Sequence, residues 1–84
     1  MNRYIVFSKP QCPYCIKAVE LLKEKGVVNS VVNFNDSMDQ QIILSEVKAA
    51  YDYKTVPMVF KRDGDSVQFI GGYTDLVEHF SQDG

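Results

Sequence analysis

The stretch Cys12-Pro13-Tyr14-Cys15 decides the fold of this 84-residue chain, because one kind of local structure gives way to another there. It follows a short apolar run, Arg3-Tyr4-Ile5-Val6-Phe7, and it opens a helical pattern. A strand that leads to a cysteine and a helix that begins there place one sulfur at a helix N-terminus. Unpaired backbone N–H groups and the helix dipole favour a thiolate at that position. The stretch holds the only two cysteines of the sequence, so it predicts a redox site.

Composition is that of an ordinary globular protein, with 45% hydrophobic residues and a formal net charge of −2. A chain of this length has room for one domain, residues 1–84, with a small core. The scattered lysines and arginines form no basic stripe, which argues against nucleic acid as a partner. No apolar run approaches the roughly 20 residues of a membrane span, and we expect no charged-then-apolar leader before the first strand. We therefore expect a cytoplasmic monomer that does not bind membranes.

The rest of the chain alternates between strand and helix patterns. Apolar residues at helical spacing predict three helices, and β-branched and aromatic runs predict four strands. In chain order we expect a strand at 3–7, a helix at about 13–25, a strand at 27–34, a helix from about 37 to 53, strands at 56–60 and 66–70, and a helix capped by residue 74. The order β-α-β-α-β-β-α predicts one compact α/β domain.

Local signals predict how some of these elements pack. The first strand, helix and strand form a β-α-β unit, so the two strands should be parallel. Asp63-Gly64 predicts an antiparallel hairpin between the last two strands. The buried face of the second helix is expected to consist of Ile43, Val47, Ala50 and Tyr51.

Three motifs resemble those of one known family. They are Cys12-Pro13-Tyr14-Cys15 preceded by Lys9, then Thr55-Val56-Pro57, and then Gly71-Gly72-Tyr73-Thr74-Asp75. In this order and spacing the chain resembles a dithiol glutaredoxin of the CPYC type, a member of the thioredoxin superfamily. The resemblance implies a thioredoxin-like fold, in which three helices flank a four-stranded mixed sheet and both faces of the sheet carry helices. It also implies a glutathione groove beside the first helix.

The two cysteines are expected to have unequal roles. Cys12, at the start of the helix, should be the attacking thiolate, and Cys15, one turn on, falls on the apolar stripe and should be the resolving thiol. The helix dipole supplies only about 0.3–1 kcal/mol. Hydrogen bonds from the N–H groups of Tyr14 and Cys15, together with the charge of Lys9, are therefore expected to supply the rest of the stabilisation of the thiolate.

The resemblance also implies a set of glutathione-binding residues. Lys9 and Lys54 would hold the glycine carboxylate, and the Val56 backbone would pair with the cysteinyl part like an added strand, because the Val56–Pro57 bond is cis in this superfamily. The backbone N–H groups of Thr74 and Asp75 would take the γ-glutamyl carboxylate at the start of the last helix. The full set is Lys9, Tyr14, Lys54, Thr55, Val56, Pro57, Gly72, Thr74 and Asp75.

The function that follows is glutathione-dependent reduction of mixed disulfides and protein disulfides, with ribonucleotide reductase as a possible electron acceptor. Glutathione would be the co-substrate, and no metal is expected. One alternative is a related redoxin recharged by thioredoxin reductase. Another is a non-enzymatic module that docks a partner or shares an iron–sulfur cluster between two subunits, although Pro13 stands where cluster-binding relatives commonly carry a smaller residue. A structural zinc site in one chain lacks donors, since His79 is the only further soft ligand.

Overall fold

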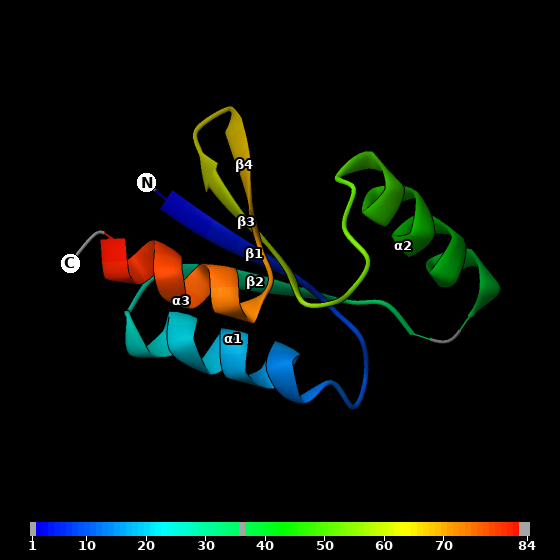
Figure 1. The fold of residues 1–84 in the computed structure, drawn as a ribbon, viewed down its shortest axis with the longest axis horizontal. Coiled ribbons are helices and arrows are strands. Elements are labelled where there is room, and N and C mark those ends of the chain that lie inside the picture. The colour runs from blue at the N-terminus through cyan, green and yellow to red at the C-terminus, as the bar shows by residue number, and fades with distance from the viewer. Residues whose placement is uncertain (1, 36, 83–84) are drawn as a thin grey trace.

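A computed structural model describes residues 2–35 and 37–82 of the chain (Figure 1). Its elements are β1 (Asn2–Ser8), α1 (Pro13–Glu24), β2 (Val28–Asn33), α2 (Met38–Ala50), β3 (Met58–Asp63), β4 (Ser66–Gly71) and α3 (Tyr73–Gln82). This is the order predicted from the sequence. None of the helices in these two ranges is long and apolar enough to cross a membrane.

The four strands form one mixed sheet in the order β2-β1-β3-β4. β1 and β2 are parallel, with Val6 beside Val31. β3 runs antiparallel to both β1 and β4. The turn between β3 and β4 contains Gly64 with φ +61°, a conformation that glycine adopts at no steric cost. The predicted parallel pair and the predicted hairpin are both confirmed.

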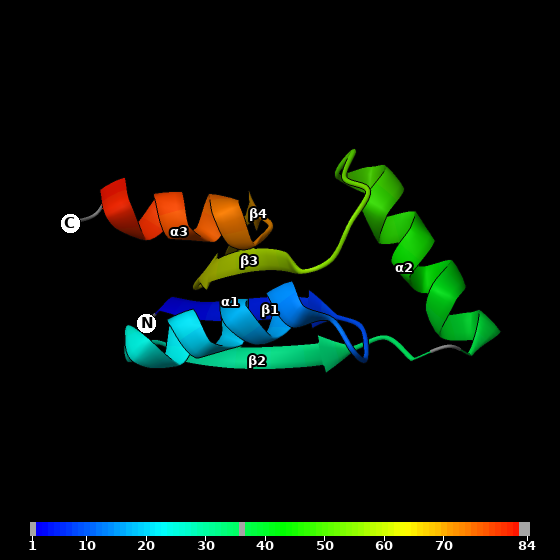
Figure 2. The same cartoon turned by 60° about the horizontal axis from the view of Figure 1, so that its bottom comes forward.

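The main core lies on one face of this sheet, which α1 and α3 cover side by side (Figure 2). Because successive strand residues point to opposite faces, alternate residues of β1 enter the core and the others face away from it. Its buried members are Tyr4, Val6, Ala18, Leu22, Val59 and Leu76. Residues from four elements, β1, α1, β3 and α3, therefore hold the two helices against the sheet.

The helix α2 ends in a Schellman motif, in which the chain turns back through one residue of left-handed conformation. That residue is Asp52, with φ +50°. Its N–H donates to the carbonyl of Ala49, and the N–H of Tyr53 donates to the carbonyl of Lys48. The predicted helix end near Tyr53 is therefore about three residues too late, because aspartate can adopt the conformation that Gly26 adopts after α1.

The helix α2 stands beyond the end of the sheet where β1 and β2 finish (Figures 1 and 2). Within the described parts of the chain, no Cα atom of α2 lies within 8 Å of a Cα atom of another helix or strand. The predicted buried face is therefore largely wrong: Ile43 and Tyr51 are 47% and 45% exposed, Ala50 is exposed and Val47 is half-buried, whereas Leu44 is buried. Helical spacing identifies an apolar stripe but does not show how closely the helix approaches the sheet.

The C-terminal part of α2 and its cap residue Tyr51 contact the second face of the sheet. The ring of Tyr51 packs against those of Phe60 and Phe69, with centroid distances of 5.2 and 5.1 Å. Val47 lines an apolar pocket of about 230 Å³ together with Ile5 of β1. The resemblance implied helices on both faces of the sheet, and on the second face α2 approaches the sheet through Val47 and Tyr51.

Two further boundaries differ from the prediction. β3 begins at Met58, which is the first residue of the strand to pair with β1, so residue 56 precedes it. α3 begins at Tyr73, and the carbonyl of Gly72 accepts the N–H of Leu76. Thr74 therefore lies inside the first turn and does not cap the helix, because the backbone already turns into the helix at the glycine.

Candidate active site

The two cysteines lie at the N-terminus of α1. Cys12 is the N-cap residue and Pro13 occupies the first helical position, where its missing N–H costs no helix hydrogen bond. The Sγ atom of Cys12 accepts a hydrogen bond from the N–H of Cys15 at 3.3 Å. An N-cap side chain accepts from the second or third helical residue, and here it is the third. The additional bond expected from the N–H of Tyr14 is not among the hydrogen bonds of the described residues.

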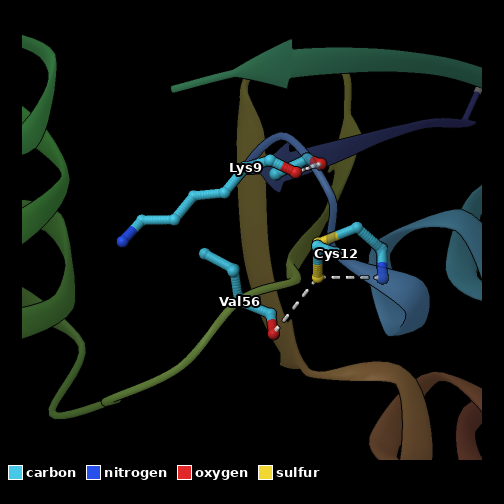
Figure 3. Close-up of a disulfide and its surroundings, with 5 residues drawn as sticks. Lys9, Cys12 and Val56 are labelled. Atoms are coloured by element: carbon cyan, nitrogen blue, oxygen red, sulfur yellow. Dashed lines mark hydrogen bonds between the residues drawn. A yellow bond between two sulfur atoms is a disulfide. The ribbon is translucent and has the colours of Figure 1, made fainter. Parts of the chain in front are cut away.

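Cys12 and Cys15 form a disulfide, with their Cα atoms 5.2 Å apart (Figure 3). Cys15 is 2% exposed, whereas Cys12 is only half-buried. The two sulfurs therefore differ in access in the predicted direction. An incoming sulfur can approach Cys12 more easily than Cys15.

The loop before β3 brings its backbone to this disulfide. The carbonyl oxygen of Val56 lies 4.0 Å from the Sγ atom of Cys12, as Figure 3 shows. The Val56–Pro57 peptide bond is cis, as the resemblance implied. Pro57 is buried and Val56 is half-buried, so the backbone at this point is held beside the sulfur by packing.

A pocket of about 320 Å³ opens between the start of α1, the loop before β3 and the start of α3. It is lined by Tyr14, Tyr53, Thr55, Val56, Pro57, Gly72, Tyr73, Thr74 and Asp75. These include every residue expected to bind glutathione except Lys9 and Lys54. Three distant segments of the sequence therefore meet at one groove beside the disulfide.

The end of the groove at α3 is held together by a carboxylate. The Oδ2 atom of Asp75 accepts hydrogen bonds from the N–H of Gly72 at 3.0 Å and from the hydroxyl of Tyr53 at 3.5 Å. A Cβ atom at position 72 would stand 2.5 Å from the Tyr53 hydroxyl and 3.6 Å from the carbonyl oxygen of Pro57. The Pro57 distance is ordinary contact, so a larger residue at position 72 would displace the Tyr53 hydroxyl rather than the proline.

The two expected cations lie outside the lining of the groove. The side chain of Lys9 extends away from the Cys12 sulfur and toward α2 (Figure 3). Burial lowers the pKa of Lys48 in α2, and the nearby charge of Lys9 lowers it further. Lys54 lines a second pocket, of about 370 Å³, with Lys48. Cys12 is in a disulfide in this structure and the Lys9 side chain turns toward α2, so the support of the Cys12 thiolate by Lys9 stays a prediction.

Two residues of this region were missed in the sequence. Tyr53 lines both pockets and donates a hydrogen bond to Asp75. Lys48 lines the second pocket with Lys54 and lies close enough to Lys9 for the charge of Lys9 to lower its pKa. The place of Tyr53 just before Lys54-Thr55 was the only available signal. Its role depends on the turn at Asp52, which the helical pattern did not reveal.

No metal site is evident in the described ranges, where no three His, Cys, Asp or Glu side chains are grouped so as to hold an ion. The Nε2 atom of His79 lies 3.0 Å from the hydroxyl of Tyr4. The ring of His79 also contacts that of Tyr4, so the histidine packs against the core.

A disulfide at a helix N-terminus, facing a cis-proline loop on a sheet of this order, defines a thiol–disulfide oxidoreductase with a thioredoxin-like fold. The family model for glutaredoxin matches residues 4–67. "Glutaredoxin-1" of Rhizophagus irregularis is 33% identical over 76 residues, which cover 90% of this chain and 71% of the relative. The chain belongs to the glutaredoxin family.

Solved structures agree with this result. Glutaredoxin 1 from Francisella tularensis, crystallised with cacodylate, superimposes with a TM-score of 0.80 at 21% identity, and the match covers 98% of this chain and 95% of that one. At this identity the likeness concerns the fold alone. A buckwheat glutaredoxin–glutathione complex gives a TM-score of 0.81 at 26% identity over 98% of this chain and 71% of that one. The predicted thioredoxin-like fold is therefore confirmed.

Proposed function

We propose that this glutaredoxin uses glutathione to reduce glutathione mixed disulfides and protein disulfides. The observation that carries the proposal is the groove beside the Cys12–Cys15 disulfide, which gathers Tyr14, Val56 and Asp75 from three segments. A similar structure, from buckwheat, is described as a complex with glutathione. We further propose that the chain works as a monomer in the cytoplasm, where thiols are kept reduced.

In the first step the Cys12 thiolate attacks the glutathione sulfur of a mixed disulfide. A bond forms between Cys12 Sγ and that sulfur, and the substrate protein leaves as a thiolate that takes up a proton. A second glutathione thiolate then attacks the bound glutathione sulfur, which releases glutathione disulfide and restores Cys12. The helix N-terminus and the N–H of Cys15 favour the thiolate at both stages.

Reduction of a protein disulfide uses both cysteines. Cys12 attacks one sulfur of the substrate, and Cys15, after losing its proton, attacks Cys12 and releases the reduced substrate. The product is the Cys12–Cys15 disulfide, the state that the fold accommodates at the start of α1. The proposed substrates are disulfide-bearing or glutathionylated proteins, among them ribonucleotide reductase.

The groove supplies partners for each part of glutathione. The exposed ring of Tyr14 forms one wall, and the backbone of Val56 would pair with the cysteinyl part. The first N–H groups of α3, near Thr74, are free of helix hydrogen bonds and would take the γ-glutamyl carboxylate. The carboxylate of Asp75 would meet the γ-glutamyl ammonium.

Exchanging both Lys9 and Lys54 for glutamate is expected to raise KM for the glutathione mixed disulfide about tenfold and to change kcat less than about twofold. The glycine carboxylate of glutathione would relieve the repulsion between these lysines. Repulsion in this region is evident because the charge of Lys9 lowers the pKa of Lys48. The loss would therefore fall on binding rather than on the chemical step. Lys23→Glu, an exposed change at the far end of α1, is the matched control. An unchanged KM in the double variant would contradict a role for the lysines.

The proposed function is tested by recharging the oxidised protein. With glutathione, glutathione reductase and hydroxyethyl disulfide, we expect turnover that saturates with the mixed disulfide. With thioredoxin reductase in place of glutathione, we expect no comparable turnover. The reverse result would establish the alternative redoxin, and turnover with neither would refute the proposed enzyme.

A further inference from the structure

Tyr53 connects two walls of the groove that are far apart in the sequence. It follows the left-handed turn at Asp52, and its N–H is bound to the carbonyl of Lys48 by the Schellman motif. Its ring packs edge-on against Phe69, with a centroid distance of 5.2 Å and an interplanar angle of 79°. Both the backbone and the ring of Tyr53 are thus held before any ligand enters.

The hydroxyl of Tyr53 reaches the start of α3. It donates to the Oδ2 atom of Asp75 at 3.5 Å, and the same oxygen accepts the N–H of Gly72 at 3.0 Å. Both bonds use one carboxylate oxygen. Among the described residues no hydrogen bond uses the other, Oδ1, which leaves it available to a donor from a ligand.

The position of Gly72 shows how closely the hydroxyl packs. A Cβ atom there would stand 2.5 Å from the Tyr53 oxygen, so only a glycine admits the ring in this place. The 3.5 Å separation from Asp75 is long for a hydrogen bond to a carboxylate, and such bonds in binding sites tighten when the ligand is in place.

We infer that Tyr53 is a positioning residue, whose hydroxyl holds the Asp75 carboxylate in the orientation that receives the ammonium of the γ-glutamyl group. This inference rests on the proposed use of glutathione. It assigns to Tyr53 an indirect role, because the hydroxyl acts on Asp75 and the carboxylate acts on the ligand. The ring itself forms the wall between the groove and the neighbouring pocket that contains Lys48 and Lys54.

The test is Tyr53→Phe, which keeps the ring and removes the hydroxyl. KM for the mixed disulfide of glutathione and mercaptoethanol should rise about threefold to tenfold at unchanged kcat. In an Asp75→Ala background the same substitution should have no effect on KM. With a glutathione analogue that lacks the γ-glutamyl amino group, wild type and Tyr53→Phe should have equal KM values.

The control is Tyr51→Phe, which removes a hydroxyl from the same end of α2 but outside the groove, and KM should not change. An unchanged KM in Tyr53→Phe would overturn the inference, as would an equal rise in the Asp75→Ala background or with the analogue. If wild type itself fails to saturate with the mixed disulfide, the proposed function fails instead. The two failures are therefore distinguishable.

Discussion

Replacement of Cys12 by serine is expected to reduce the rate of deglutathionylation to that of the uncatalysed exchange. A serine hydroxyl is not ionised at neutral pH and cannot form a disulfide, so the N-terminus of α1 would have no thiolate to stabilise. The measurement is turnover of the glutathione mixed disulfide with glutathione and glutathione reductase. Mass spectrometry should find no glutathione attached to the variant.

Cys15→Ser is the matched comparison, since it removes the second sulfur from the same helix. It should retain turnover of the mixed disulfide and lose reduction of protein disulfides, because only the second reaction needs a resolving thiol. The 2% exposure of Cys15 supports this division. If Cys12→Ser kept full turnover of the mixed disulfide, or if Cys15→Ser alone lost it, Cys15 would be the attacking thiolate and Cys12 the resolving thiol.

Leu22→Ala is expected to lower the free energy of unfolding by about 3 kcal/mol, because the side chain is fully buried between α1 and the sheet. For a domain of 84 residues this corresponds to a fall in Tm of about 12 to 24 °C. Thermal unfolding followed by circular dichroism measures the change. Such a loss is a large fraction of the stability of a small domain.

Ile16→Ala provides the control in the same helix. Ile16 is 58% exposed, so its truncation removes little buried surface and should shift Tm by only a few degrees. Similar losses for Ile16 and Leu22 would mean that α1 does not pack on the sheet as described.

The framework of the fold could be predicted because local signals and global packing agree there. The run at 3–7 favours a strand, the cysteines favour a helix start and the glycine after α1 favours a helix end. The spacing of apolar residues in α1 places Ala18 and Leu22 on one face of the helix. The Asp63-Gly64 pair likewise selects the hairpin. Where local preference and tertiary contacts agree in this way, the sequence alone predicts the structure.

The second helix could not be predicted to the same extent. Its apolar stripe is real, but spacing carries no information on whether a helix lies along a sheet or stands past its end. Ile43 is exposed while Leu44, one residue on, is buried. The end of the helix depends on a left-handed aspartate at position 52, a conformation open to few residue types and strongly signalled only by glycine.

The family motifs identified residues that the fold brings together, but they did not reveal contacts between distant parts of the chain. The expected residues at 55–57, 72, 74 and 75 do meet at the groove. Tyr53 belongs to no motif, and its bond to Asp75 joins residues 22 positions apart. Lys9 lies three residues before Cys12, as in the motif, but its side chain extends toward α2.

The position of α2 gives the chain an uneven resistance to local opening. α1 buries Cys15, Ala18 and Leu22, whereas α2 buries only Leu44. Segments with few buried apolar contacts exchange their amide hydrogens through partial unfolding well below the global free energy. The amides of α2 should therefore exchange much faster than those of α1, and equal protection of both helices would contradict this. With faster exchange in α2, the segment from β1 to β2, which carries both cysteines, stays folded while α2 unfolds and refolds locally beside it.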